Sequence, residues 1–291
     1  MAEQRWAEIE VAASGDAAQE ATGAVMTEIV GAAGYAVSSV AVTAYLPVDD
    51  RLENTLLALK AALYEVKRVH KIPGSSDEIT IRFVAEEDWA TAWKQYFKPQ
   101  KIGERFVVKP TWEAYEAAPN DVVIQIDPGM AFGTGLHATT RLCLLGLERH
   151  IFSGATVADV GTGSGILAVG AILLGAGSAE AVDNDPLAVR IAQENVDLNG
   201  VADRVNVFEA AEPPTGEYDF VVANILAHVI IALSAELFRA TKPGGLLISS
   251  GILAGTSAEQ VAKHLTGVGF TDAEIVIEGE WASVVARRPA V

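Results

Sequence analysis

The stretch Val157–Asp185 reads VADVGTGSGILAVGAILLGAGSAEAVDND, and it decides the fold of the chain. A short apolar run over 157–160 ends in a loop with glycines at positions 161, 163 and 165, and a second apolar run follows. Ala181-Val182-Asp183 closes the unit. The order predicts a strand, a glycine loop, a helix, a second strand and an acid. Such a unit brings a backbone loop close to a ligand and places a carboxylate where it can accept hydrogen bonds from a ribose.

Outward from this stretch, predicted strands alternate with predicted helices to the end of the chain. Strands are expected at 156–160, 180–183, 205–209, 220–223, 246–250, 273–278 and 281–286. Helices are expected at 166–174, 187–198, 226–240 and 257–266. This alternation is typical of an α/β fold with a parallel, doubly wound sheet. The last two strands meet at Gly279-Glu280 and predict an antiparallel hairpin, which favours methyltransferases over dehydrogenases.

The composition indicates a globular, acidic protein. The chain has 291 residues, and 21 Lys and Arg against 38 Asp and Glu give a formal net charge of −17. This charge argues against a nucleic-acid surface, which needs a basic patch, and permits a basic protein partner. The single cysteine, Cys143, excludes an intramolecular disulfide. We see no signal peptide and no membrane-spanning run, so we expect a cytoplasmic protein.

Residues 1–86 predict a small α+β domain of their own. Strands are expected at 6–11, 37–45 and 78–84, and amphipathic helices at 16–30 and 52–69. This order suits a small sheet covered by two helices, in a ferredoxin-like arrangement. The segment contains no constellation of catalytic residues, so we expect it to serve recognition or support.

Residues 87–118 concentrate aromatic and basic side chains, including Trp89, Trp93 and Trp112. One interpretation is a connector whose aromatic side chains wedge two domains together. The other is a nucleic-acid surface, since aromatic and basic residues alternate there. The overall negative charge favours the connector, and residues 119–291 are then the cofactor-binding domain.

The spacing of the glycines narrows the choice of ligand. Glycines 161, 163 and 165 form G-x-G-x-G, whereas the dinucleotide fingerprint needs G-x-G-x-x-G, and residue 166 is isoleucine. The chain contains no G-x-x-x-x-G-K-[ST] segment for a phosphate-binding loop. S-adenosylmethionine has no phosphates, and it fits a close backbone loop together with Asp183 on its ribose. The alternative is that Asp183 is a solvated acid at the end of a strand.

Two further segments predict parts of a site. Residues 132–137 (FGTGLH) form a glycine-rich loop that either approaches a ligand or is a simple flexible turn. Asn224 follows an apolar strand at the edge of the sheet where ligands bind. Its amide could hold a target amine, and it could also cap the helix that follows.

These residues resemble a known family, the bacterial ribosomal protein L-11 methyltransferases. The resemblance rests on the segments Asp127–Thr140 (DPGMAFGTGLHATT) and Gly161–Gly165, on Asp183, and on the segments at 224–227 and 279–281. It covers the chain from about Trp93 to the end, and DPGMAFGTGLH is its most specific part.

The resemblance implies a seven-stranded class I methyltransferase fold and S-adenosyl-L-methionine as cofactor. It implies methylation of lysine side chains and of the N-terminal amine of ribosomal protein L-11, which the small N-terminal domain presents. The predicted cofactor site consists of Phe132, Gly133, Thr134, Gly135, Thr140, Gly161, Gly163, Gly165, Asp183 and Asn224. Asn224 is also expected to position the target amine. His137 is a candidate base by residue type, although a structural role in its loop is an equal alternative.

Other functions stay open at this point. A related methyltransferase could act on glutamine, adenine or a small molecule, but enzymes for the first two usually carry Asn-Pro-Pro-aromatic where this chain has Asn224-Ile225-Leu226-Ala227. A non-catalytic, cofactor-binding protein associated with the ribosome is the second alternative. We expect a monomer without a bound metal, without direct contact to nucleic acid and without a membrane anchor.

Overall fold

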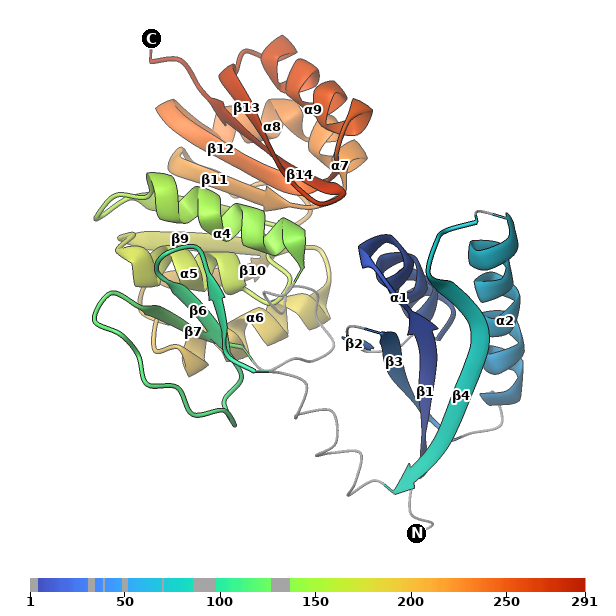
Figure 1. Cartoon of the computed structure of the whole chain (residues 1–291). Coiled ribbons are helices and arrows are strands. Elements are labelled where there is room, and N and C mark those ends of the chain that lie inside the picture. Colours follow the sequence, from blue (N-terminus) through green and yellow to red (C-terminus); the bar gives the residue numbers. More distant parts are fainter. Residues whose placement is uncertain are drawn as a thin grey trace. The chain divides into compact units, whose positions relative to one another are not determined.

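The computed structural model describes residues 5–30, 35–38, 40–48, 52–69, 71–85, 98–126 and 137–290. The chain divides into two compact units, Met1–Lys98 and Pro99–Val291 (Figure 1). Each unit has its own hydrophobic core, so each is described by itself.

The first unit is a four-stranded antiparallel sheet with two helices. Its elements are β1 (Arg5–Ala13), α1 (Asp16–Val30), β2 (Tyr35–Val37), β3 (Ala41–Pro47), α2 (Leu52–Tyr64), the π-helix η1 (Glu65–Val69) and β4 (Ser75–Ala85). The strand order β2-β3-β1-β4 confirms the predicted ferredoxin-like α+β fold. Ile9 and Val11 alternate toward Leu59 and Leu63 of α2 in the core. The sequence pattern does not separate the short strand β2 from β3, because its three residues lie too close to β3 to show a period of their own.

The second unit begins with a three-stranded sheet. Its strands are β5 (Gln100–Ile102), β6 (Phe106–Lys109) and β7 (Val122–Gln125), in the order β5-β6-β7. Phe106 and Ile124 are fully buried against helix α5 (Ile166–Leu174). The range predicted as a connector, 87–118, therefore contains two strands that belong to the core of the second unit. Trp89 and Trp93 lie outside the described residues.

A seven-stranded sheet forms the centre of the second unit. Its strands are β8 (Thr156–Val160), β9 (Ser178–Asp183), β10 (Val205–Glu209), β11 (Tyr218–Asn224), β12 (Thr241–Leu253), β13 (Thr271–Glu278) and β14 (Trp281–Arg287), in the order β10-β9-β8-β11-β12-β14-β13. The first five strands are parallel, and β14 is antiparallel to both β12 and β13. This confirms the doubly wound sheet and the terminal hairpin. The strand order reverses between β8 and β11, and sheets of this kind bind ligands at such a switch point.

Helices cover both faces of this sheet (Figure 1). One face packs against α4 (Ala138–His150), α5 and α6 (Pro186–Leu198). The other packs against α7 (Ala227–Ala232), α8 (Ser234–Ala240) and α9 (Thr256–Gly267). The single helix predicted over 226–240 divides at Leu233, whose ψ of 7° leaves the helical region. Within the described ranges, none of the helices is both long enough and apolar enough to cross a membrane.

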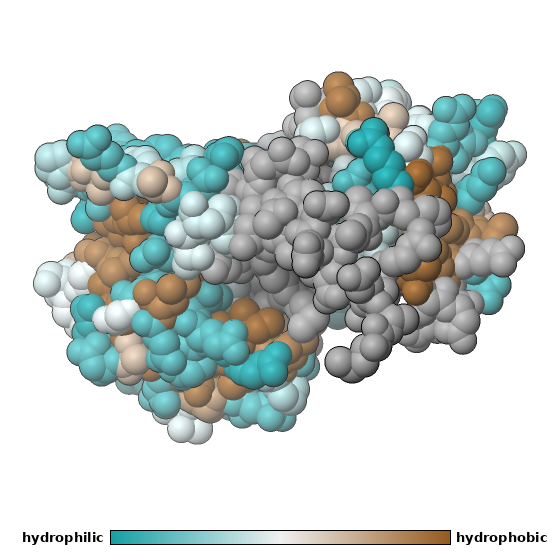
Figure 2. Space-filling model, turned by 90° about the horizontal axis from the view of Figure 1, so that it is seen from below, coloured by the Kyte–Doolittle hydropathy of each residue, from teal (hydrophilic) through white to brown (hydrophobic). Residues whose placement is uncertain are grey.

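The described surface shows polar and apolar groups side by side (Figure 2). The most exposed large apolar side chains include Val40, Leu57 and Leu226, which belong to different parts of the chain. Single apolar side chains of this kind are usual on globular proteins and do not by themselves mark a binding surface.

Candidate functional site

The glycine loop joins β8 to α5 at the carboxyl edge of the sheet. Gly161, Gly163 and Gly165 have φ values of +72°, +56° and +80°, which side chains rarely adopt. A Cβ atom on Gly161 would also lie 2.3 Å from Cγ2 of Ile225. The loop therefore needs glycine both for its backbone conformation and for its close contact with the segment that follows β11.

Asp183 ends β9 beside this loop. Its Oδ2 accepts the backbone N–H of Gly163 at 2.9 Å, and its Oδ1 accepts the N–H of Asp185 at 3.0 Å. The side chain is partly exposed. A carboxylate offers about four acceptor positions, so two remain for the hydroxyl groups of a ligand. Asp183 thus orients the glycine loop and keeps the capacity to bind a ribose.

Asn224 ends β11 and has a buried side-chain oxygen. Its Nδ2 donates to Oγ1 of Thr140 in α4 at 3.3 Å. Its Oδ1 is buried and has no hydrogen-bond partner among the residues that the structure describes. A buried carbonyl oxygen without a partner is costly, so such an atom at a ligand-binding edge indicates a missing donor. Asn224 does not cap the next helix, because α7 begins after Leu226.

His137 is the N-cap residue of α4. Its Nδ1 accepts the backbone N–H of Thr139 at 3.3 Å and lies 2.7 Å from the Thr139 hydroxyl oxygen. The ring makes an edge contact with Trp281, at 4.9 Å between centroids. Burial lowers the pKa of His137, which favours the neutral ring at pH 7. These contacts give His137 a capping role, and its assignment as a base stays a prediction.

The structure does not describe the second predicted glycine loop. The predicted positions Phe132, Gly133, Thr134 and Gly135 lie outside the described residues, as do Asp127, Pro128 and Gly129. Of the predicted residues, the structure therefore places Thr140, Gly161, Gly163, Gly165, Asp183 and Asn224 at one edge of the sheet, with His137 at the start of α4.

Asp159 in β8 is a site-supporting residue that the sequence pattern did not reveal. Its side chain is fully buried, and its Oδ2 accepts the Thr162 hydroxyl at 2.7 Å and the Ala168 N–H at 3.1 Å. Burial raises the pKa of Asp159 to about 6, and the charge of Asp183 adds to this effect. The signal in the sequence is an acid inside an apolar strand, two residues before the glycine loop. Asn195 is a second supporting residue that the sequence does not predict. Its Nδ2 donates to the Ser164 carbonyl in the glycine loop at 2.8 Å.

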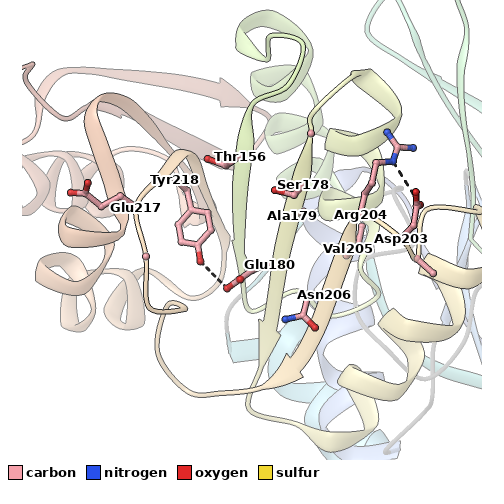
Figure 3. A pocket seen from close by; sticks show the side chains of 13 residues that line it. Thr156, Ser178, Ala179, Glu180, Asp203, Arg204, Val205, Asn206, Glu217 and Tyr218 are labelled. Atoms are coloured by element: carbon pink, nitrogen blue, oxygen red, sulfur yellow. Dashed lines mark hydrogen bonds and ion pairs between the residues drawn. The ribbon is translucent and has the colours of Figure 1, made fainter.

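A cavity of about 460 Å³ lies at the opposite edge of the sheet (Figure 3). Thr156, Ser178, Val205 and Tyr218, the first residues of their strands, line it, and the Tyr218 hydroxyl donates to Glu180 at 2.7 Å. Ligands of parallel sheets bind at the carboxyl ends of the strands, whereas this cavity is at the amino ends. We therefore place the candidate site at the glycine loop and Asn224 rather than in this cavity.

The residues at the carboxyl edge fit S-adenosylmethionine better than a dinucleotide. The loop supplies close backbone approach without the third glycine of the dinucleotide fingerprint. Asp183 retains acceptor positions, and the orphaned Asn224 oxygen faces no donor in the described residues. A nucleoside and an amine are the groups that would satisfy these atoms.

Comparison with known proteins identifies relatives of the whole chain. The family model described as "Ribosomal protein L11 methyltransferase (PrmA)" matches residues 5–289. The ribosomal protein L11 methyltransferase of Pelotomaculum thermopropionicum is 48% identical over 86% of this chain and 80% of its own length. The corresponding protein of Chloroflexus aurantiacus is 45% identical over 84% of this chain and 81% of its own length.

A solved structure shows the same likeness. The crystal structure of ribosomal protein L11 methylase from Lactobacillus delbrueckii subsp. bulgaricus is 33% identical, with a TM-score of 0.60. It covers 66% of this chain and 100% of that chain. On the strength of the family model and of these relatives, this chain belongs to the ribosomal protein L11 methyltransferase family.

Proposed function

We propose that this protein is an S-adenosylmethionine-dependent N-methyltransferase that methylates lysine side chains and the N-terminal amine of ribosomal protein L11. The observation that carries the proposal is the buried Oδ1 of Asn224, which has no hydrogen-bond partner within residues 137–290 or the other described ranges. Gly161 of the glycine loop packs against Ile225, which directly follows Asn224 in the chain. A cofactor bound at the loop and an amine bound at Asn224 would therefore be neighbours. Membership of the family supports the choice of substrate.

Each residue has a defined task in this proposal. When bound, S-adenosylmethionine supplies an electrophilic methyl group. The backbone of the glycine loop and the Asp183 carboxylate hold it, and the Asn224 oxygen accepts an N–H of the target amine. This contact directs the nitrogen lone pair and contributes positioning rather than acid–base chemistry. A lysine amine has a solution pKa of about 10.4, so it must lose a proton before it reacts. We assign that proton to solvent, since His137 already uses Nδ1 as the cap of α4.

The charge of the chain supports a basic protein as substrate. A net charge of −17 attracts a basic partner and repels nucleic acid. We propose that the N-terminal unit holds the substrate protein and that the part of the aromatic segment before β5, residues 87–98, connects the two domains. A ribosomal substrate implies that the protein acts in the cytoplasm, and its monomeric state remains an expectation.

The proposed activity predicts label in a single ribosomal protein. The purified protein would be incubated with methyl-labelled S-adenosylmethionine and with ribosomal proteins and RNA from a strain that lacks the activity. We expect label in L11 and in no other component, at lysine side chains and at the N-terminal amine by mass spectrometry. Label in RNA or in a small molecule would favour a different methyltransferase. No label despite bound cofactor would favour the non-catalytic alternative.

Replacing Asp183 by alanine is expected to weaken cofactor binding by about 10- to 150-fold, because a hydrogen bond to a charged group contributes about 1.5–3 kcal/mol. Isothermal titration calorimetry with S-adenosylmethionine measures this loss. Asp203→Ala is the matched control, because Asp203 is an exposed aspartate at the opposite edge of the sheet. Unchanged affinity in Asp183→Ala would reject the ribose assignment.

A further inference from the structure

Two ion pairs join helix α4 to strand β13. Nε of Arg141 donates to Oε1 of Glu278 at 2.8 Å, and Nη1 of Arg149 lies 3.2 Å from Oε1 of Glu274. Eight residues of a helix span about 12 Å, and four residues of a strand span about 13 Å. The two pairs are therefore in register along elements that run in opposite directions.

The two pairs differ in their distance from the candidate site. Arg141 directly follows Thr140, which accepts the hydrogen bond from Asn224. Glu278 is the last residue of β13 and pairs across the hairpin with Trp281. Arg149 and Glu274 lie toward the other ends of the same two elements. Their side chains are 64% and 51% exposed, whereas those of the first pair, Arg141 and Glu278, are 33% and 35% exposed.

The first turn of α4 gathers groups from strands that are not neighbours. Asn224 belongs to β11 and Trp281 to β14, and β12 lies between them in the sheet. Thr140 contacts Asn224, and His137 contacts Trp281. Arg141 donates to Glu278, the last residue of β13. The position of the hairpin relative to Asn224 thus depends on this turn as well as on the backbone ladder.

We propose that Arg141 and Glu278 form a clasp that sets the position of the β13–β14 hairpin at the carboxyl edge of the sheet, one strand away from Asn224, and that the acceptor amine enters there. Arg141 is then a positioning residue for the acceptor side of the reaction, and it does not contact the cofactor. This inference rests on the proposed function. Removing either partner frees the hairpin end and leaves a half-buried charge without its partner, so use of the acceptor should suffer more than cofactor binding.

The two pairs supply their own matched controls. We would compare Arg141→Gln and Glu278→Gln with Arg149→Gln and Glu274→Gln, measuring initial rates over a range of L11 concentrations and the cofactor Kd by calorimetry. We expect kcat/KM for L11 to fall about tenfold in the first two variants, as for mutations that alter coupling between parts of a site. The cofactor Kd should change less than twofold in all four, and kcat/KM should stay near wild type in the last two.

A charge-reversed pair and hydrogen exchange decide between positioning and plain stability. Arg141→Glu combined with Glu278→Arg restores the attraction, so we expect it to recover at least part of kcat/KM. Amide exchange needs no substrate, and it should accelerate around residues 278–281 in Arg141→Gln but not in Arg149→Gln. Equal effects of the two pairs on both readouts would overturn the clasp. If the two pairs have equal effects but the wild-type protein methylates L11, the clasp is rejected and the proposed function stands. If the wild-type protein does not methylate L11, the proposed function is rejected, and amide hydrogen exchange alone tests the clasp.

Discussion

Replacing Asn224 by alanine is expected to lower kcat for methyl transfer by about 100-fold, because a small misplacement of reacting groups can cost that much. The variant removes both the buried oxygen that faces the proposed amine and the donor to Thr140. Cofactor affinity should fall less, since the glycine loop and Asp183 remain. Single-turnover rates with saturating L11 and calorimetry with S-adenosylmethionine separate the two effects. A kcat within threefold of wild type would reject the positioning role.

Asn224→Asp distinguishes hydrogen bonding from size. A carboxylate beside an amine favours the protonated ammonium, which cannot act as a nucleophile. We therefore expect a slow variant whose rate–pH profile is displaced to higher pH relative to that of the wild type, because the carboxylate raises the pKa of the amine. Asn206→Ala is the control, because Asn206 is an exposed asparagine at the amino edge of the same sheet. Its rate and pH profile should match those of the wild type.

Much of the fold could be predicted from the sequence because its signals are local. The glycine loop, the alternation of strands and helices and the terminal hairpin are all encoded in short segments, and the structure confirms each of them. The strands over residues 100–109 are hidden within a predicted connector because aromatic and basic residues dominate the composition of that range. Their place in the second unit follows from Phe106 packing on α5, a contact between distant parts of the chain.

The candidate site was predictable where a polar residue ends a strand. Asp183 and Asn224 both do so, and the edge of a parallel sheet brings such residues together. Asp159 was not predictable as a site residue, because a strand covered on both faces shows no alternation of apolar and polar residues. Its full burial arises only in the folded second unit, where α5 packs on β8. His137 remained ambiguous because a capping histidine and a catalytic one look alike in sequence.

Replacing Asp159 by alanine is expected to destabilise the second unit by about 3 kcal/mol at about pH 5, where the folded carboxyl is mostly protonated and alanine removes no buried charge. Helix α5 begins after Gly165, which has no side chain to cap it, and its third residue, Ala168, donates its N–H to Asp159 instead. Asp159 thus caps the helix from the neighbouring strand. Alanine leaves this N–H and the Thr162 hydroxyl without their acceptor and opens a space in the core. Urea unfolding would measure the loss, and Asp159→Asn should retain most of the stability because its amide oxygen can accept both bonds.

The comparison of Asp159→Asn with the wild type should depend on pH. Burial raises the pKa of Asp159 from its ordinary value of 3.8 to about 6, so between these values the folded protein holds a proton that the unfolded chain has lost. Stability therefore falls as the pH rises through this window, and above pH 6 the buried charge costs about 3 kcal/mol. Burial also raises the pKa of the neighbouring Cys143, which keeps its thiol neutral throughout.

Asparagine does not titrate, so the raised pKa of Asp159 can be measured as a pH-dependent difference in stability between Asp159→Asn and the wild type. The stability of Asp159→Asn relative to the wild type should increase by about 1–2 kcal/mol between about pH 5 and about pH 7.5. Other titrating groups are common to both proteins and cancel in the difference, except for Asp183, whose charge contributes to the raised pKa of Asp159. When Asp183→Asn is the background of both proteins, the stability of the Asp159→Asn, Asp183→Asn double variant relative to Asp183→Asn should therefore increase less over the same pH range. A difference that stays constant with pH would mean that Asp159 is charged in the folded protein at both pH values, and that the hydrogen bonds to Thr162 and Ala168 outweigh its burial.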